Sequence, residues 1–452
     1  MKKLTAIILC ILLVLSLAAC GKDDDRNHDK DRDGQKSVTD DAKDKDKDKD
    51  TEKNPSEKSD DIRALEERYS LRTEDGLEWE YTASTKSIVI SGEGPMRDYY
   101  DEIPEWDKYA NEAERVVIGD EVTSVGAMAF YGLPELREIS LGEKVEYIGE
   151  YAFQYCTNLL TVNYPDGLRY IGNYAFANAL FHSDCGFILP EGLLYVGNSA
   201  FYSAFKESFV ALPASLSCIG EKAFDNCFVE EFRVAPGNPK YIAVDGVLYA
   251  EQGALLMNYP ADKKAVVFEI PNTVTAIRSG AVQTTGTLER IVIPASVSNI
   301  EEEAFFWNYA LGNIDVAEDN QYYTSIEGVL FTKDGKLLLC YPIGSERADY
   351  TVPSGTEIIA KSAFSGASDL QVLVLGEELL EIHSDAFRFC SSIFEIYAYE
   401  NLQSIDENAF NGCDAVTKVF CKGDSLKFES IQIKEGNQAF SDNMILQNTD
   451  TE

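Results

Sequence analysis

The chain has 452 residues, and its 77 acidic and 40 basic residues give a formal net charge of −37. A single compact core rarely grows to this length, so several domains or a repeat array with a lengthwise core are expected. The negative charge excludes nucleic acid and anionic membrane surfaces as natural partners, because both repel an acidic surface.

Residues 1–19 have the layout of a secretory signal peptide. Lys2 and Lys3 precede an apolar run, and Leu17-Ala18-Ala19 places small residues directly before Cys20. This ending resembles the lipobox of bacterial lipoproteins, and the resemblance implies cleavage before Cys20 and lipidation of its thiol. An ordinary cleaved signal or a short membrane helix is the alternative.

Residues 20–61 combine the expected lipidated cysteine with a polar segment almost free of aromatic residues. Lysine and aspartate alternate from Lys43 to Asp50. Such a composition cannot bury a core, so we predict a disordered, charged tether.

Residues 62–115 are predicted to form an amino-terminal β cap. Polar and apolar residues alternate over 77–81 and 87–91, as in half-buried strands, and Gly92 to Met96 end the second strand. Because this segment lacks the repeated pattern that follows it, we expect it to cover the first unit of a repeat array.

Residues 116–424 repeat one pattern, mostly at spacings of 23 or 25 residues. Each copy has an aromatic anchor, an aliphatic residue five positions before it, and apolar residues six, nine and eleven positions after it. The anchors are Phe130, Phe153, Phe176, Phe201, Phe224, Phe305, Phe364, Phe387 and Phe410, with Val282 as a weakened copy. A fixed period of this length predicts a solenoid whose coils bury their apolar faces on one another.

Two local structures are expected in each coil. The alternating positions 8 to 11 after the anchor predict a short β-strand, and the Gly-x-x-Ala-Phe segment, as at Gly149 to Phe153, suits one or two helical turns. Four cysteines occupy the position three after the anchor, where other copies have leucine or alanine: Cys156, Cys227, Cys390 and Cys413. This exchange favours buried thiols over metal ligands or disulfides, although Cys390 and Cys413 could pair in an exported protein.

Two gaps between anchors are longer, 58 residues from Phe224 to Val282 and 59 from Phe305 to Phe364. Their contents match at an offset of 82: the stretch from Gly246 corresponds to the stretch from Gly328. Asp334-Gly335, between two apolar runs, is a strong tight-turn signal. We therefore predict a β-hairpin insert in each gap.

The pattern Ile-Gly-x-x-Ala-Phe-x-x-Cys-x-x-Leu-x-x-Val, read from Ile148 to Val162, is similar to the BspA-like leucine-rich-repeat family. The inserts and the cap also resemble that family, and the match runs from Leu77 to about Phe420. The resemblance implies a leucine-rich-repeat-like right-handed solenoid of parallel β-strands, used in surface attachment and protein binding. Because the asparagine that follows the strand in ordinary leucine-rich repeats is missing, no bonded asparagine ladder is expected.

The sequence contains few residues in settings suited to catalysis. It has three histidines: His28 in the tether, His383 in a position that other copies fill with glycine, and His182 in the segment Phe181-His182-Ser183-Asp184-Cys185. That segment could suggest a nucleophile with its base or a metal pair, but one loop cannot supply the whole constellation. We therefore expect no catalytic residue, metal site or cofactor.

A candidate binding surface lies on the last complete coils. Strand alternation directs four apolar or aromatic side chains outward: Val372, Val374, Tyr397 and Phe420. Contiguous outward apolar residues mark contact surfaces. Alternatively, residues 425–452, a predicted carboxy-terminal cap or tail, fold back over them.

These features predict an exported, lipid-anchored, non-catalytic monomer at the bacterial cell surface. The leading hypothesis is adhesion to, or binding of, an extracellular protein, with no membrane contact beyond the lipid. A glycan-binding protein that uses some of the 24 tyrosines is the alternative, and a surface hydrolase is a weaker one.

Overall fold

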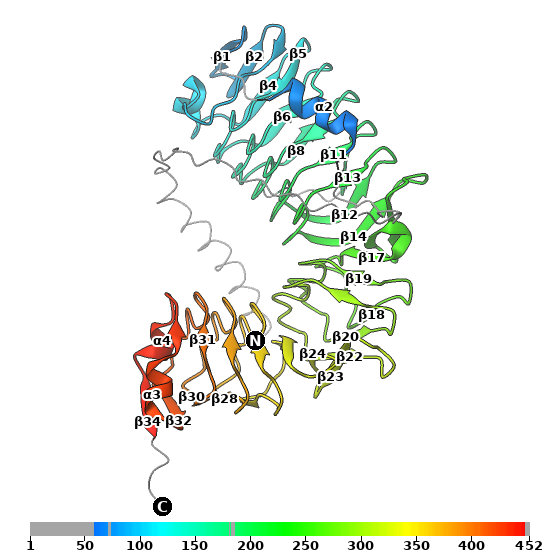
Figure 1. Cartoon of the computed structure of the whole chain (residues 1–452). Helices are drawn as coiled ribbons and strands as arrows, with labels where there is room; N and C mark the ends of the chain where they lie inside the picture. Colours follow the sequence, from blue (N-terminus) through cyan, green and yellow to red (C-terminus); the bar gives the residue numbers. More distant parts are fainter. Residues whose placement is uncertain (1–57, 71–73, 180, 182–185, 448–452) are drawn as a thin grey trace, which may run out of the picture. The chain divides into compact units, whose positions relative to one another are not determined.

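The computed structural model describes residues 58–70, 74–179, 181 and 186–447. The predicted signal peptide, Cys20, nearly all of the predicted tether and the segment His182 to Cys185 lie outside these residues. From the cap onward, successive coils follow one another in chain order (Figure 1). The protein is a parallel-β solenoid, as predicted, and it has few helices.

Each coil contributes a strand to each of two faces. In the coil anchored by Phe153, β8 carries Val162 and β7 carries Ile148. Val162 pairs with Ile139 one coil earlier, and Ile148 pairs with Ile171 one coil later, both in parallel. We name the sheets that contain β8 and its counterparts the long-strand face, and those that contain β7 and its counterparts the short-strand face. The sequence predicted only the first of these strands.

Across the described residues, seven sheets make up the two faces. The long-strand face consists of β1 (Glu78–Thr82), β2 (Ser87–Ser91), β4 (Arg115–Ile118), β6 (Glu138–Ser140), β8 (Thr161–Asn163), β10 (Phe187–Ile188), β12 (Lys206–Leu212), β14 (Phe228–Val234), β18 (Val267–Glu269), β20 (Arg290–Ile293), β22 (Asn313–Val316), β26 (Asp349–Thr351), β28 (Val372–Val374), β30 (Glu395–Tyr399), β32 (Lys418–Lys422) and β34 (Met444–Gln447). The short-strand face consists of β3 (Gly94–Pro95), β5 (Val122–Val125), β7 (Tyr147–Ile148), β9 (Tyr170–Ile171), β11 (Tyr195–Val196), β13 (Cys218–Ile219), β17 (Leu255–Asn258), β19 (Ala276–Ile277), β21 (Asn299–Ile300), β25 (Leu337–Cys340), β27 (Ile358–Ile359), β29 (Glu381–Ile382), β31 (Ser404–Ile405) and β33 (Gln432–Ile433), together with the insert strands β15 (Tyr241–Val244), β16 (Val247–Ala250), β23 (Tyr323–Ile326) and β24 (Val329–Thr332). The helical segments are α2 (Asp60–Arg68), η1 (Glu105–Tyr109), η2 (Glu251–Gly253), α3 (Ser425–Glu429) and α4 (Gln438–Ser441).

The core between the faces contains a ladder of anchor rings. Phe153 is fully buried, and its ring stacks on Phe130 at 5.4 Å and on Phe176 at 5.3 Å between ring centroids. Trp106 of the cap continues the ladder on one side, 5.4 Å from Phe130. The predicted register is therefore confirmed, with the anchors inside.

The coil corners at the anchors are not the helical turns that the sequence predicted. The residues two before and two after the anchor adopt left-handed backbone conformations, as at Tyr151 (φ 57°) and Tyr155 (φ 62°). A regular helix would need negative φ throughout. The spacing of three to four residues reflects instead one tight corner that recurs in coil after coil.

Side-chain oxygens bridge some of these corners. The amide oxygens of Asn173 and Asn198 accept hydrogen bonds from the backbone N–H groups of Asn198 and Glu221, at 2.9 and 2.8 Å. A short asparagine ladder therefore exists where none was expected. The two asparagines follow β9 and β11 of the short-strand face, at the start of the anchor corner, and do not follow strands of the long-strand face.

Each insert is an antiparallel pair that leads into a strand of the short-strand face. β15 pairs with β16 and β16 with β17, as β23 pairs with β24 and β24 with β25. Tyr259 and Tyr341 follow directly and donate their backbone N–H groups to the carbonyls of Ala281 and Ala363, just as Phe153 donates to Ala175. These tyrosines are thus the anchors of the insert coils, which the sequence did not reveal.

The two ends extend the same faces. In the cap, β1 pairs antiparallel with β2, and β2 pairs in parallel with β4. At the other end, β33 and β34 add to both faces, and Phe440 stacks on Phe410 at 5.0 Å. Residues 425–447 therefore form one more, irregular coil.

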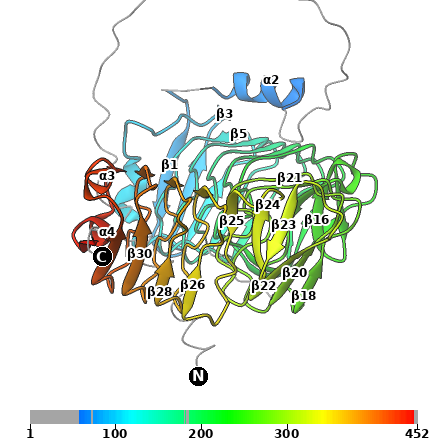
Figure 2. The ribbon, with the colours of Figure 1, turned by 60° about the horizontal axis from the view of Figure 1, so that its bottom comes forward.

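Helix α2 packs outside the coils, on the short-strand face (Figure 2). Its buried Ile62 and Leu65 lie with Tyr170, Tyr195 and Cys218 in a cluster separate from the solenoid core. The outward tyrosines of β7, β9 and β11 stack at 4.5 Å and form the seat of the helix.

Candidate interaction surface

Three of the four residues predicted to form a binding surface lie in one register row of the last sheet of the long-strand face. Val374 pairs with Tyr397, Tyr397 with Phe420, and Phe420 with Ile445. Leu373, Ile396 and Val419 directly precede the three predicted residues, point to the core and are buried. We call Val374, Tyr397, Phe420 and Ile445 the outward row; the structure adds Ile445, which is 41% exposed.

Several contacts fix the two aromatic rings of this row, those of Tyr397 and Phe420. The rings of Tyr397 and Phe420 stack at 5.1 Å, and the Tyr397 hydroxyl donates to Glu395 at 2.6 Å. The ammonium groups of Lys422 and Lys418 lie 4.9 Å from the Tyr397 ring and 5.9 Å from the Phe420 ring. Such contacts orient the rings before any partner arrives.

The fourth predicted residue, Val372, lies in the adjoining register row. It pairs with Glu395, which pairs with Lys418. Val372 is only partly buried and therefore borders the outward row on its charged side.

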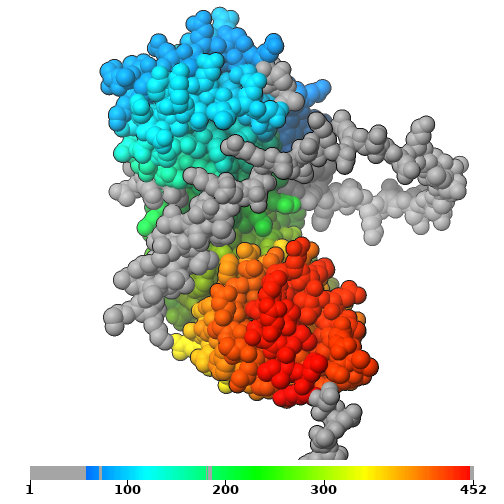
Figure 3. All heavy atoms as spheres, turned by 90° about the vertical axis from the view of Figure 1, so that its left-hand side faces the viewer, coloured from blue at the N-terminus to red at the C-terminus, as the bar shows by residue number. Residues whose placement is uncertain are grey.

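The described part of the tail does not cover this surface. β34 lies beside β32 in the plane of the sheet, and its Ile445 prolongs the row. Figure 3 shows these last coils in orange and red. The expected alternative, in which the tail folds over the row, does not hold as far as Gln447.

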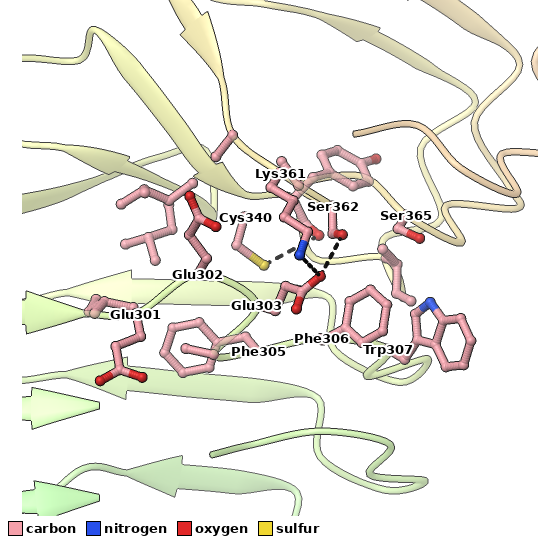
Figure 4. Close-up of a pocket in the computed structure, with 18 residues that line it drawn as sticks. Glu301, Glu302, Glu303, Phe305, Phe306, Trp307, Cys340, Lys361, Ser362 and Ser365 are labelled. Atoms are coloured by element: carbon pink, nitrogen blue, oxygen red, sulfur yellow. Dashed lines mark hydrogen bonds and ion pairs between the residues drawn. The ribbon is translucent and has the colours of Figure 1, made fainter. Parts of the chain in front are cut away.

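A cleft lies between the corners of two coils separated by the second insert coil (Figure 4). Glu303 accepts a hydrogen bond from the Ser362 hydroxyl at 2.9 Å and pairs with Lys361 at 3.3 Å. The Trp307 Nε1 and Ser365 Oγ atoms are buried without a partner among the described residues. The enclosed space is about 40 Å³, enough for a few ordered waters, whereas substrate pockets start at roughly 300 Å³.

The buried thiols have no catalytic character. Cys156 and Cys227 donate to the carbonyls of Phe130 and Phe201, and burial raises the pKa of both thiols to about 12. A thiol nucleophile needs a lowered pKa. Cys390 and Cys413 are also free and buried, so the predicted core role is confirmed and the disulfide between them is not formed.

Among the described residues, the other side chains considered for catalysis or metal binding do not come together in one site. Nε2 of the His383 ring lies 3.3 Å from Glu381, an isolated surface contact. No group of three metal-ligating side chains comes together within the residues that the structure describes. In the same residues, no helix is long and apolar enough to cross a membrane.

A comparison with models of protein families shows to which family the chain belongs. The model of the BspA type leucine rich repeat region matches residues 108–230, 262–337 and 345–450 with six copies. The chain belongs to the BspA-type leucine-rich-repeat family. Its coils are therefore of the kind found in bacterial leucine-rich-repeat proteins, which are generally interaction modules without catalysis.

Solved structures show the same fold at low identity. A leucine-rich repeat protein from Eubacterium ventriosum is 22% identical, with a TM-score of 0.57, over 76% of this chain and 94% of that one. A leucine rich cell surface protein from Faecalibacterium prausnitzii is 22% identical, with a TM-score of 0.50, over 81% of this chain and 98% of that one. A search of curated proteins returned no match.

Proposed function

We propose that this BspA-type protein is a lipid-anchored, monomeric surface protein that binds an extracellular protein through the outward row. The observation that carries this proposal is the continuation of the row through Ile445 without cover from the described tail. Partly exposed aromatic residues beside basic side chains are typical of the energetic centres of protein interfaces.

Ring geometry favours a protein over a glycan as partner. Sugar rings need the open face of an aromatic side chain. Tyr397 and Phe420 instead stack on each other, and the exposed Tyr174 likewise stacks on Tyr151 at 5.1 Å with an interplanar angle of 5°. One face of each of these rings is thus occupied by its neighbour, which favours a protein surface as the partner.

The attachment part of the proposal rests on Cys20. With Cys20→Ala, the lipidation site is lost, and the protein should leave the membrane fraction after washing without detergent. A mutant that stays with the membranes would show that the apolar segment itself is the anchor.

The binding part is tested with the Cys20→Ala chain immobilised and exposed to cell-surface protein extracts. Tyr397→Ala should weaken the binding of the captured partner by about 2 kcal/mol and leave the melting temperature of the protein nearly unchanged. Tyr174→Ala is the matched control, because it also removes a solvent-accessible tyrosine from a stack of 5.1 Å: Tyr174 is 36% exposed and Tyr397 is partly exposed. Equal capture by both variants, or a fall in melting temperature for Tyr397→Ala alone, would remove the outward row from the proposal.

A further inference from the structure

A second concave site lies in the cap, far along the chain from the outward row. It measures about 310 Å³, within the range of ligand sites, which starts at roughly 300 Å³. β1 contributes Trp79 to its wall, and the segment after β2 contributes Met96 and Tyr99. Trp106 of η1 completes the aromatic lining.

The aromatic walls are fixed by contacts among themselves. Trp106 meets Trp79 edge-on at 5.9 Å and Tyr99 edge-on at 5.3 Å. The Trp106 indole N–H donates to the carbonyl of Ala129 at 2.8 Å, and that of Trp79 donates to Glu105 at 3.3 Å. These contacts fix the rings in place. Trp106 and Tyr99 are only 5% and 6% exposed, so of the three rings it is the partly exposed Trp79 that the cleft presents.

Carboxylates dominate the charge of the lining. Among the described residues, Glu74, Asp75, Glu78 and Glu105 line the cleft, against one guanidinium, that of Arg97. Asp75 is engaged by the backbone N–H groups of Leu77 and Arg97 at 3.2 and 2.8 Å. Glu74, Glu78 and Glu105 are exposed, so the cleft has an excess of accessible negative charge.

The same rings already hold cations of the protein itself. The Lys108 ammonium lies 5.0 Å from the Trp79 ring, and the Arg97 guanidinium lies 4.7 Å from the Tyr99 ring. Both distances lie within the roughly 6 Å over which a cation is attracted to a ring face. This environment therefore favours positive charge on aromatic surfaces.

We propose that the cap cleft binds the arginine or lysine side chain of a basic polypeptide. The partly exposed Trp79 would contact the stem and the cationic head, and the exposed glutamates would supply the counter-charge. A neutral sugar would use the rings but gain nothing from the carboxylates. This site is independent of the outward row, so either can fail without the other.

Tryptophan fluorescence can report binding directly, because two of the three tryptophans line this cleft. Trp307→Phe in the otherwise full chain leaves only the cleft signal. The probe is a short capped peptide that carries two arginines, and its control is the same peptide with uncharged citrulline. We expect saturable quenching by the arginine peptide that weakens with salt, and none by the citrulline peptide.

Two isosteric variants separate the cleft from the general acidity of the chain. Glu105→Gln removes a charge in the cleft but keeps an acceptor for Trp79, and it should weaken binding about fivefold. Glu80→Gln removes the same charge one residue from Trp79, but Glu80 does not line the cleft, so this variant should bind like the parent. Equal affinities of the two variants, equal quenching by citrulline peptide, or salt-independent quenching by a soluble neutral glucan would overturn the proposal.

Discussion

At the scale of single residues, different side chains make the same hydrogen bond from the position three after the anchor. Three positions after the anchor, the Cys156 thiol donates to the carbonyl of the preceding anchor, Phe130. Asn308 in its own coil donates in the same way to Val282, at 2.7 Å. A thiol or an amide at this position thus satisfies the carbonyl of the previous anchor, which would be costly to leave unpaired, whereas copies with leucine or alanine supply no side-chain donor there.

Phe153→Ala should lower the free energy of unfolding by roughly 3 to 5 kcal/mol, as expected when a fully buried aromatic side chain is truncated. Urea denaturation followed by circular dichroism measures the change. The exposed Tyr174→Ala is the control and should cost much less. A loss below about 1 kcal/mol would contradict the ring ladder.

Tyr259→Phe should leave the protein equally stable or stabilise it by about 1 kcal/mol. The Tyr259 hydroxyl is buried without a partner among the described residues, and burial raises its pKa to about 12. Phenylalanine is the usual anchor in other coils and removes this cost. Comparing the denaturation midpoints of Tyr259→Phe and wild type tests this, and clear destabilisation would mean that water or another group satisfies the hydroxyl.

At the scale of elements, α2 is held by few contacts. Its apolar contribution is Ile62, Leu65 and Tyr69, with Tyr69 stacked on Tyr147 at 4.9 Å. The Tyr170 hydroxyl donates to Glu66 at 2.7 Å. A helix of nine residues is marginal by itself in water, so its order depends on this seat.

Leu65→Ala should therefore release α2 while the coils stay folded. Hydrogen exchange should become fast over residues 60–68 and remain slow in β9 and β11. Arg63→Ala, at an exposed position of the same helix, is the control and should keep the protection. Unchanged exchange in Leu65→Ala would show that the polar contacts alone hold the helix.

The sequence predicted those elements whose apolar pattern extends over enough residues or coils to be recognised. The anchors, the aliphatic residues before them and the strands of the outward row repeat over many coils, and their burial confirms the register. The strands of the short-strand face are often only two residues long, as at Tyr147–Ile148, which is too short for an alternation to be visible.

Other features depend on contacts that a linear pattern does not contain. Tyr259 and Tyr341 lack the usual preceding alanine, so their anchor role emerges only from the backbone bonds to Ala281 and Ala363. The left-handed corners were hard to recognise because tyrosine, lysine and serine occupy them in several coils, which masks the glycines and asparagines found there in other coils. The cap cleft joins Trp79 and Trp106 across 27 positions of the chain.

At the scale of the whole molecule, buried cysteine thiols and tyrosine hydroxyls make the free energy of unfolding depend on pH. Burial raises the thiol pKa of Cys156, Cys227 and Cys340 from the ordinary 9.0 to about 12. Tyr259 behaves similarly, with a pKa of about 12 against an ordinary 10.0. Folding thus favours the protonated forms, and the stability they provide is complete below the unfolded pKa and is lost as the pH rises toward the folded pKa.

We therefore expect alkaline unfolding that begins near pH 9 and is complete toward pH 12, the window set by these pKa values. Urea midpoints measured from about pH 8 to about pH 11 should fall steadily. The variant Cys156→Ala should show a shallower fall, because one titrating group is gone. A midpoint that does not change over this range would contradict the burial of the thiols.

The correspondence of the two inserts has a consequence for how such a chain can vary in length. The stretches that begin at Asn238 and Asn320 lie 82 positions apart, and each opens an insert coil whose tyrosine anchor is followed by coils of regular length. Because every coil meets its neighbours through the same ring, corner and strand contacts, such a block could be duplicated or deleted without leaving an unpaired core surface. Recombination could thereby lengthen or shorten the reach of the protein while the cap cleft at one end and the outward row at the other are inherited intact.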